Sequence, residues 1–210
     1  MNREENINLA QRTSLLDRPR LESLYDRAEQ AIELPGCFVE CGCGWGGSAS
    51  LLAGVLHRYK SSKRLVLCDA FDEFPPADLT LDKSDQFTDQ QTYDISKSVM
   101  PGEAVILGRC HEAGPSAEVV TRKGRLEDTL TVWPFGPIAM LHADADWYSS
   151  TKAILWGLVK HLLPGALMIF DDYHFWSGCR QAVDEFFAGL NVKPAWERVS
   201  CSVWARLPKV

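Results

Sequence analysis

The chain has 210 residues, a formal charge of -6 at pH 7 and a hydrophobic content of 46%. This length and composition suffice for one substantial core and leave little room for a second, so we expect a single domain over residues 1–210. The acidic balance without a basic block argues against a nucleic-acid partner, and no apolar run reaches the roughly 18 residues needed to cross a bilayer.

The first twelve residues are polar and contain no apolar segment of the kind found in secretory signals. The seven cysteines include no C-x-x-C pair, and four of them lie in or beside expected strands. An odd cysteine count without a signal fits a reducing compartment better than a disulfide framework. We therefore expect a soluble cytoplasmic protein whose cysteines are small buried apolar residues.

Strand-like and helix-like segments alternate along the chain, which predicts an α/β fold on a parallel sheet. A helix is expected over residues 20–34 and ends at Pro35 and Gly36, so residues 1–36 would form an N-terminal helical cap. The apolar residues of this helix occupy much of its circumference, which would suit packing on a second subunit of a homo-oligomer. Strands are expected at 37–41, 64–68, 117–121, 138–143 and 166–170, and further helices at 48–59 and 150–163.

Two segments differ from this alternation. Residues 75–102 are polar and irregular, and such a length without a clear element indicates a functional lid or a mobile loop. Residues 198–206 alternate between apolar and polar side chains, which predicts a half-buried antiparallel strand at the end of the domain.

A glycine-rich loop follows the first expected strand. Gly42, Gly44 and Gly47 match the G-x-G-x-x-G pattern of dinucleotide-binding loops. Glu40 stands directly before them and would repel a pyrophosphate, whereas S-adenosylmethionine carries an ammonium and a sulfonium that suit an acid. Asp69 ends the next strand about 20 residues later, where an acid accepts ribose hydroxyls from either cofactor. An NAD(P)-dependent oxidoreductase is therefore the alternative from another class of enzyme.

Four aspartates follow two neighbouring strands, Asp144 and Asp146 after one, Asp171 and Asp172 after the next. Asp144 and Asp171 are 27 residues apart, close to the length of one βαβ unit, so their strand ends should lie side by side. Carboxylates this close repel one another unless a proton or a divalent cation compensates, and an all-oxygen site suits Mg²⁺. The alternative is that these aspartates are helix caps or turn residues.

Several motifs around the loop and the aspartates match one pattern. They are D-A-D-W-Y-S-S-T at 144–151, D-D-Y at 171–173, D-A-F-D-E-F-P at 69–75 and G-R-L-E-D-T-L at 124–130. Together they resemble the macrocin O-methyltransferase (TylF-like) family. The resemblance runs from about residue 20 to residue 187 and so covers most of the chain.

The resemblance implies a Rossmann-like class I methyltransferase with a mostly parallel seven-stranded sheet, flanking helices and an antiparallel C-terminal strand. It implies S-adenosylmethionine- and Mg²⁺-dependent methylation of a hydroxyl on a small molecule, most often a sugar of a natural-product glycoside. Carried onto this sequence, Asp144, Asp171 and Asp172 become metal ligands, and Asp144 is also a candidate base. The cofactor residues expected are Glu40, Gly42, Gly44, Gly46, Ser48, Asp69, Ala70 and Leu126.

Other readings of the site differ in substrate or in activity. Two vicinal oxygens would chelate Mg²⁺ best, which suits a sugar diol and equally a catechol. Catechol O-methyltransferases expect a lysine where Trp147 stands and an Asp-Asn pair where Asp171 and Asp172 stand, so the sugar-type interpretation is favoured. His174, just after the D-D-Y motif, is a second catalytic candidate. A non-catalytic cofactor-binding module is the alternative without turnover.

Overall fold

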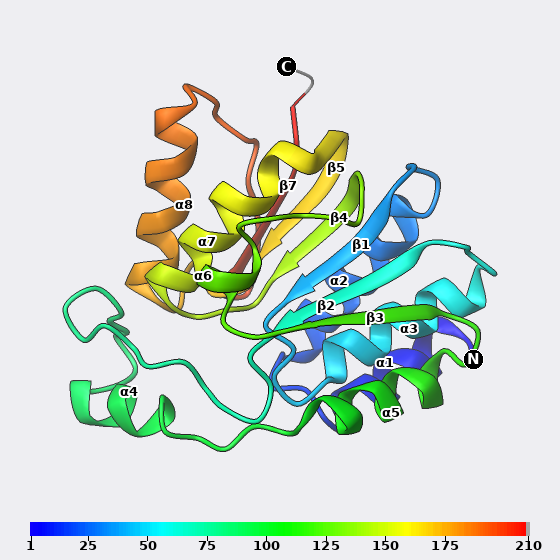
Figure 1. Cartoon of the computed structure of the whole chain (residues 1–210), viewed down its shortest axis with the longest axis horizontal. Helices are drawn as coiled ribbons and strands as arrows, with labels where there is room; N and C mark the ends of the chain where they lie inside the picture. The colour runs from blue at the N-terminus through cyan, green and yellow to red at the C-terminus, as the bar shows by residue number, and fades with distance from the viewer. Residues whose placement is uncertain (209–210) are drawn as a thin grey trace.

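The computed structural model describes residues 1–208 and has a seven-stranded sheet at its centre (Figure 1). The strands are β1 (Cys37–Cys41), β2 (Arg64–Asp69), β3 (Glu118–Lys123), β4 (Ile138–Ala143), β5 (Leu162–Phe170), β6 (Glu197–Val199) and β7 (Ser202–Arg206). Their order is β3-β2-β1-β4-β5-β7-β6. The strands β3, β2, β1, β4 and β5 are parallel, and β7 and β6 are antiparallel to their neighbours. The predicted α/β fold with an antiparallel C-terminal end is confirmed.

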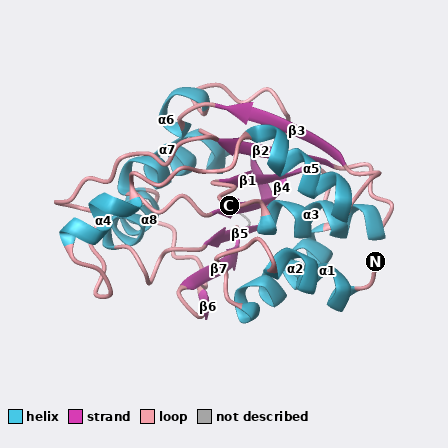
Figure 2. Cartoon of the chain, turned by 90° about the horizontal axis from the view of Figure 1, so that it is seen from below, coloured by secondary structure: helices cyan, strands magenta, loops and turns pink. Residues whose placement is uncertain are grey.

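Helices cover both faces of the sheet (Figure 2). One layer contains α1 (Arg3–Gln11), α2 (Arg18–Ala31), α3 (Gly47–Arg58) and α5 (Glu103–Ala113). The other contains α6 (Leu126–Thr129), α7 (Tyr148–Leu158), the 3-10 turn η1 (Val159–His161) and α8 (Ser177–Gly189). Within residues 1–208, none of the helices combines the length and apolar character that crossing a membrane requires.

The central strand β1 is buried over its whole length, because both faces of the sheet are covered. Successive side chains point to opposite faces, so Phe38 packs in the core under α1, α2 and α3, whereas Val39 packs in the core under α7 and α8. This alternation also decides where the polar residue Glu40 points.

The N-terminal helices pack closely on the helix that follows the glycine loop. A Cβ on Gly47 would lie 2.6 Å from the carbonyl oxygen of Ala10, so this glycine allows the end of α1 to touch the start of α3. The apolar side of α2, with Leu21, Leu24 and Tyr25, is fully buried within the chain. These residues are therefore occupied by internal packing and do not form a free surface for a second subunit.

Several elements differ from the sequence prediction. The strands at 37–41 and 138–143 have the predicted bounds, but α1, α5 and α8 were not predicted as helices. The helix α1 buries only Asn6, Ile7 and Ala10, so its apolar spacing is weak, whereas α8 has a regular helical spacing at Cys179, Ala182, Val183 and Phe187 that could have predicted it. The C-terminal segment forms two strands, because Ser200 adopts a left-handed turn (φ 56°) between β6 and β7.

The segment 75–102 extends away from the sheet, beyond the carboxyl ends of the parallel strands (Figure 1). It contains one short helix, α4 (Asp89–Ile95), whose first turn is capped by Thr88 and Gln91. The carboxylate of Asp82 is buried and accepts the Tyr148 backbone N–H at 2.8 Å, at the start of α7. The backbone N–H of Ser177 donates to the Lys83 carbonyl at 2.8 Å, at the start of α8. The segment is thus tethered over the edge of the sheet where a ligand would enter.

Candidate active site

A cavity of about 600 Å³ lies at the carboxyl ends of the parallel strands. Open α/β sheets bind their ligands at this edge. The glycine loop and the end of β2 form one part of the lining, and the acidic residues after β4 and β5 form another. Residues 13–17, between α1 and α2, and parts of the segment 73–100 complete the wall. One space therefore joins the predicted cofactor loop and the predicted metal centre.

The glycine loop lies directly against the acidic centre. Gly42 has a φ of +83°, and a Cβ there would lie 1.8 Å from the Asp144 carbonyl oxygen. The Gly42 N–H donates to the Cys68 carbonyl, and the Asp144 N–H donates to the Cys41 carbonyl, both at 2.9 Å. These two hydrogen bonds extend the parallel ladder by one residue on each strand. Only glycine can occupy position 42 without moving the backbone that carries Asp144.

Six of the eight predicted cofactor residues line the cavity, namely Gly42, Gly44, Ser48, Asp69, Ala70 and Leu126. Gly46 does not, because it forms the left-handed turn before α3, and a Cβ there would lie 2.9 Å from the Ile106 side chain of α5. Gly46 thus shapes the loop from the side that faces α5.

Glu40 is also outside the cavity lining, contrary to the expectation that it contacts the cofactor. It shares the face of Phe38 and lies one step below the loop, where its side chain is 0% exposed. Its Oε1 is 3.0 Å from Nδ1 of His142, the residue opposite it on β4. Among the described residues, Glu40 Oε2 and His142 Nε2 have no hydrogen-bond partner. The pair is a buried polar contact beneath the glycine loop.

Asp69 occupies the position expected for a ribose-binding acid. Its carboxylate accepts the backbone N–H of Cys43 and, at 2.6 Å, that of Phe71. Burial raises the pKa of Asp69 above its usual value. A carboxylate has about four lone-pair positions, so Asp69 keeps acceptor capacity for a hydroxyl group in the cavity. Asp69 is therefore both an anchor for the two loops and a free acceptor.

Three of the four aspartates form a compact oxygen cluster. Asp144, Asp171 and Asp172 each offer a carboxylate oxygen, and these oxygens lie within 4.8 Å of one another. Burial and, to a lesser extent, the neighbouring carboxylates raise the pKa of Asp144 and that of Asp172 well above the usual value. Asp171 is compensated within the chain, because Arg20 forms a salt bridge with its Oδ2 and the Ser202 hydroxyl donates to its Oδ1.

Asp146 also lines the cavity and was predicted only as a member of the acidic group, without a role. Its backbone is left-handed (φ 57°), and its N–H donates to Asp172 Oδ2 at 3.1 Å. The indole N–H of Trp176 donates to Asp146 Oδ1 at 2.8 Å. Burial raises the pKa of Asp146 to about 7. Its contact with a tryptophan 30 residues later is a tertiary feature that spacing could not reveal.

His174 is not brought into the cavity, contrary to its selection as a catalytic candidate. Its side chain is exposed and packs edge-on against Tyr173, with ring centres 4.9 Å apart. Its backbone N–H donates to the Cys201 carbonyl at 2.8 Å, which turns the chain outward after Asp172. The next two residues, Phe175 and Trp176, do line the cavity.

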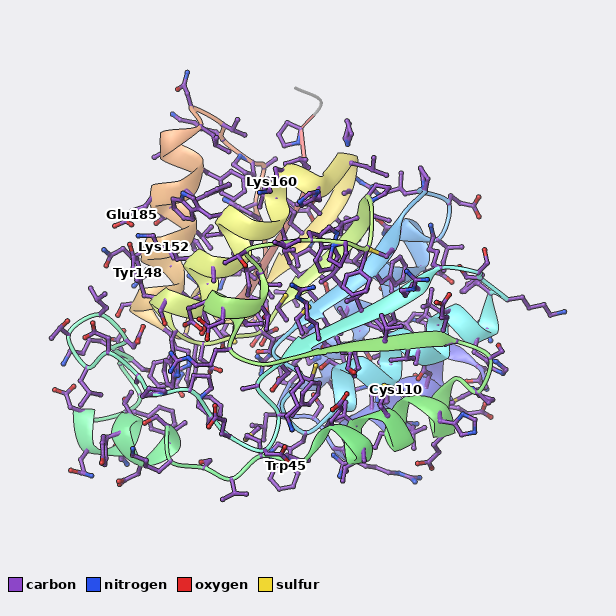
Figure 3. The ribbon with its side chains drawn as sticks, viewed as in Figure 1. Trp45, Cys110, Tyr148, Lys152, Lys160 and Glu185 are labelled. Carbon is purple, nitrogen blue, oxygen red and sulfur yellow. The ribbon has the colours of Figure 1, made fainter. Side chains whose placement is uncertain are left out.

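Phe74, Phe87 and Trp176 line the cavity next to Asp146, and the buried Trp147 packs on them from outside the lining. Trp147 packs edge-on against Phe74 and Trp176, with ring centres 5.5 and 4.9 Å apart, and Phe87 stacks on Trp176. On the opposite side, Trp45 lines the cavity from the tip of the glycine loop, is 46% exposed, and projects away from the sheet (Figure 3). The cavity thus has a polar floor and aromatic sides, which suit a ligand with both kinds of surface.

The sheet order, the glycine loop and the cavity define a Rossmann-like class I methyltransferase. The structure of the O-methyltransferase NovP is similar to this chain with a TM-score of 0.82 and 24% identity, over 94% of this chain and 83% of that chain. At this identity the similarity shows the fold. The sequence model of the family Macrocin-O-methyltransferase (TylF) matches residues 8–206, so the chain belongs to this family of S-adenosylmethionine-dependent O-methyltransferases.

Two named relatives agree with this assignment. The chain is 28% identical to mycinamicin III 3''-O-methyltransferase of Micromonospora griseorubida over 179 residues, which are 82% of this chain and 69% of that protein. It is 28% identical to demethyldecarbamoylnovobiocin O-methyltransferase of Streptomyces niveus over 184 residues, 82% of this chain and 67% of that protein. The chain therefore spans about two thirds of the length of these relatives. The family resemblance seen in the sequence is confirmed.

Proposed function

We propose that this enzyme methylates a hydroxyl group on a sugar of a natural-product glycoside or a saccharide, with Mg²⁺ bound at the acidic centre. The observation that carries the proposal is the single cavity that joins the glycine loop and Asp69 to the cluster of Asp144, Asp171 and Asp172. A glycoside acceptor is supported by the relatives, one of which is named as a 3''-O-methyltransferase of mycinamicin III.

For the cofactor, we assign the part of the cavity between the glycine loop and the end of β2. Asp69 would accept the ribose hydroxyls, with Ala70 and Leu126 beside it. Gly44 has open space around it, since a Cβ there would meet only the Met100 side chain at 4.0 Å, so the backbone can approach a ligand closely. Glu40 would act one layer below, by holding His142 under the loop.

The donor set of the acidic centre fits a hard divalent cation. Three carboxylates converge, and burial, together with the neighbouring carboxylates, raises the pKa of Asp144 and of Asp172 although Arg20 acts in the opposite direction. Carboxylate oxygens are the ligands that Mg²⁺ prefers. When bound, the ion would lower the pKa of a coordinated hydroxyl and fix its direction.

We assign Asp146 as the general base, in place of His174 and of Asp144, which we assign to the metal alone. The Trp176 indole holds Asp146 Oδ1, which leaves Oδ2 to take the proton of the acceptor hydroxyl. Bound S-adenosylmethionine would supply the methyl group to the acceptor oxygen, with the carbon–sulfur bond electrons returning to sulfur to give the thioether of S-adenosylhomocysteine. Holding both reactants in line can supply about 7 to 11 kcal/mol of the barrier reduction. The aromatic wall would help to exclude water from the reacting groups.

The test is a methylation screen with S-adenosylmethionine, Mg²⁺ and parallel panels of glycosides and catechols, read as a mass gain of one methyl group. We expect glycosides to react, and we expect chelation of Mg²⁺ or the substitution Asp144→Asn to abolish the product. Asp85→Asn is the matched control, since Asp85 is exposed and outside the cavity lining. Turnover of catechols alone would refute the acceptor class. Full turnover with chelator, or in Asp144→Asn, would refute the role of the metal.

A further inference from the structure

An arginine from the N-terminal helices reaches the acidic centre. Arg20 lies in the first turn of α2, and its side chain is only 14% exposed. Its Nη1 forms a salt bridge with Oδ2 of Asp171, across 151 positions of sequence. Because Ser202 donates to Oδ1, both oxygens of this carboxylate already have a donor. Asp171 is thus the member of the cluster that is engaged by a cation of the chain itself.

The guanidinium of Arg20 is held in place from the cavity wall. Its Nη2 donates to the Leu15 carbonyl at 3.2 Å, and its Nε is 3.4 Å from Oδ1 of Asp17. Asp17 caps α2 by accepting the Arg20 backbone N–H at 3.0 Å, and the Ser200 hydroxyl donates to its other oxygen at 2.6 Å. Arg20 is therefore a preorganised cation, unlike a surface arginine that samples many conformations.

The positive charge of Arg20 should weaken the attraction of the acidic centre for a divalent ion. Its positive charge acts on Asp144 and Asp172 as well as on its direct partner, Asp171. A guanidinium at one side of a carboxylate cluster removes part of the negative potential that attracts a divalent ion. Each Asp171 oxygen accepts one hydrogen bond, Oδ2 from Arg20 and Oδ1 from Ser202, and so keeps a further lone pair. Arg20 and a metal ion can therefore share this residue.

We propose that Arg20 is a built-in counter-cation of the acidic centre, which holds Asp171 in place without a metal and limits the affinity of the centre for a divalent ion. This inference rests on the proposed metal site. Leu15 and Asp17 line the cavity and contact Arg20, so an ion that shares Asp171 and weakens its salt bridge with Arg20 would also loosen this wall. Arg20 would thereby connect the charge state of the centre to the shape of the cavity.

The alternative role for Arg20, orienting Asp171 as a metal ligand, predicts the opposite change in metal affinity when Arg20 is removed. If Arg20 only positions Asp171 for the ion, removing it should weaken metal binding, as loss of a supporting partner commonly does. If Arg20 is a counter-cation, a neutral residue should strengthen binding. The sign of the change in affinity therefore separates the two roles.

The experiment is a titration of the whole protein with Mn²⁺, followed by the loss of the electron paramagnetic resonance signal of the free ion. We expect Arg20→Gln to bind Mn²⁺ about tenfold more tightly than the natural protein, because a unit charge beside the site is removed. Arg20→Lys, which keeps the charge, should stay within about threefold of it. Arg18→Gln is the matched control, since Arg18 lies in the same turn but pairs with Glu4 and Glu22.

The outcomes separate this inference from the metal site. Equal or weaker Mn²⁺ binding by Arg20→Gln, with binding still lost in Asp171→Asn, overturns the role of Arg20 and leaves the site intact. No binding by the natural protein or by Arg20→Gln overturns the metal site and the inference together. If Arg20→Gln does not fold, Arg20→Lys gives the answer, because it keeps the charge and loses the planar guanidinium that fixes Asp171. Mn²⁺ binding by Arg20→Lys that is more than threefold weaker than that of the natural protein overturns the inference in favour of a positioning role.

Discussion

Replacing Gly42 with alanine should damage the junction between the glycine loop and the acidic centre. The new Cβ would lie 1.8 Å from the Asp144 carbonyl oxygen and 2.6 Å from its carbon, and both are backbone atoms that cannot rotate away. The backbone at position 42 is also left-handed (φ +83°), which a residue with a Cβ adopts only at a cost. The loop and the chain after β4 must therefore move apart.

The magnitude follows from these two effects. The left-handed conformation costs about 1 to 2 kcal/mol for a residue with a Cβ. Relieving the overlap by shifting a packed backbone costs about 1 to 3 kcal/mol. Gly42→Ala should thus lower the free energy of unfolding by about 2 to 5 kcal/mol, a large part of the total for a domain. Urea denaturation followed by tryptophan fluorescence measures this loss.

The same displacement should weaken cofactor binding, because Gly42 lines the cavity. We expect the affinity for S-adenosylhomocysteine, measured by calorimetric titration of the folded variant, to fall at least tenfold. Gly108→Ala is the matched control, since nothing lies within 4 Å of a Cβ at Gly108 inside α5. That change should stabilise the helix by up to about 1 kcal/mol. A Gly42→Ala protein with unchanged stability and unchanged affinity would refute this account of the loop.

Three other substitutions test single contacts. Asp146→Asn should lower kcat by about 100-fold or more while the affinity for S-adenosylhomocysteine stays within threefold, and unchanged kcat would exclude Asp146 as the base. Glu40→Ala removes the partner of His142 Nδ1 and should cost about 1 to 3 kcal/mol of stability in urea denaturation, so a full-stability variant would contradict the buried pair. Asp82→Ala removes the acceptor of the Tyr148 N–H, and limited proteolysis within residues 75–102 should become faster; an unchanged cleavage rate would show that the tether is unimportant.

The segments that could be predicted from sequence are those whose signal is local. The strands at 37–41 and 138–143 are short apolar runs that end at glycine or aspartate, and they appear with these bounds. A strand covered on both faces must be apolar throughout, so its pattern survives in any tertiary context. The helix α1 was missed because it has few apolar positions, whereas α8 carries a local signal, the helical spacing of Cys179, Ala182, Val183 and Phe187, and could have been predicted.

The site residues likewise divide into those predictable from local sequence and those placed by tertiary packing. The spacing of Asp144 and Asp171 places them on adjacent strands, and the structure brings their oxygens within 4.8 Å together with those of Asp172. The direction of Glu40 depends on which face of β1 lies below the loop, and the exposure of His174 depends on its contact with Cys201. The direction of Glu40 and the exposure of His174 are therefore set by the packing of segments that are distant in the sequence.

The amino-acid sequence by itself thus determined the sheet-based fold class, the glycine loop, the family and the acidic cluster, because each depends on short motifs or on the length of one βαβ unit. Only the tertiary structure decided that Glu40 faces His142, that Trp176 holds Asp146 and that Arg20 reaches Asp171. The physical reason is that these contacts join segments up to 151 positions apart, and their side-chain directions are set by the packing of both layers on the sheet.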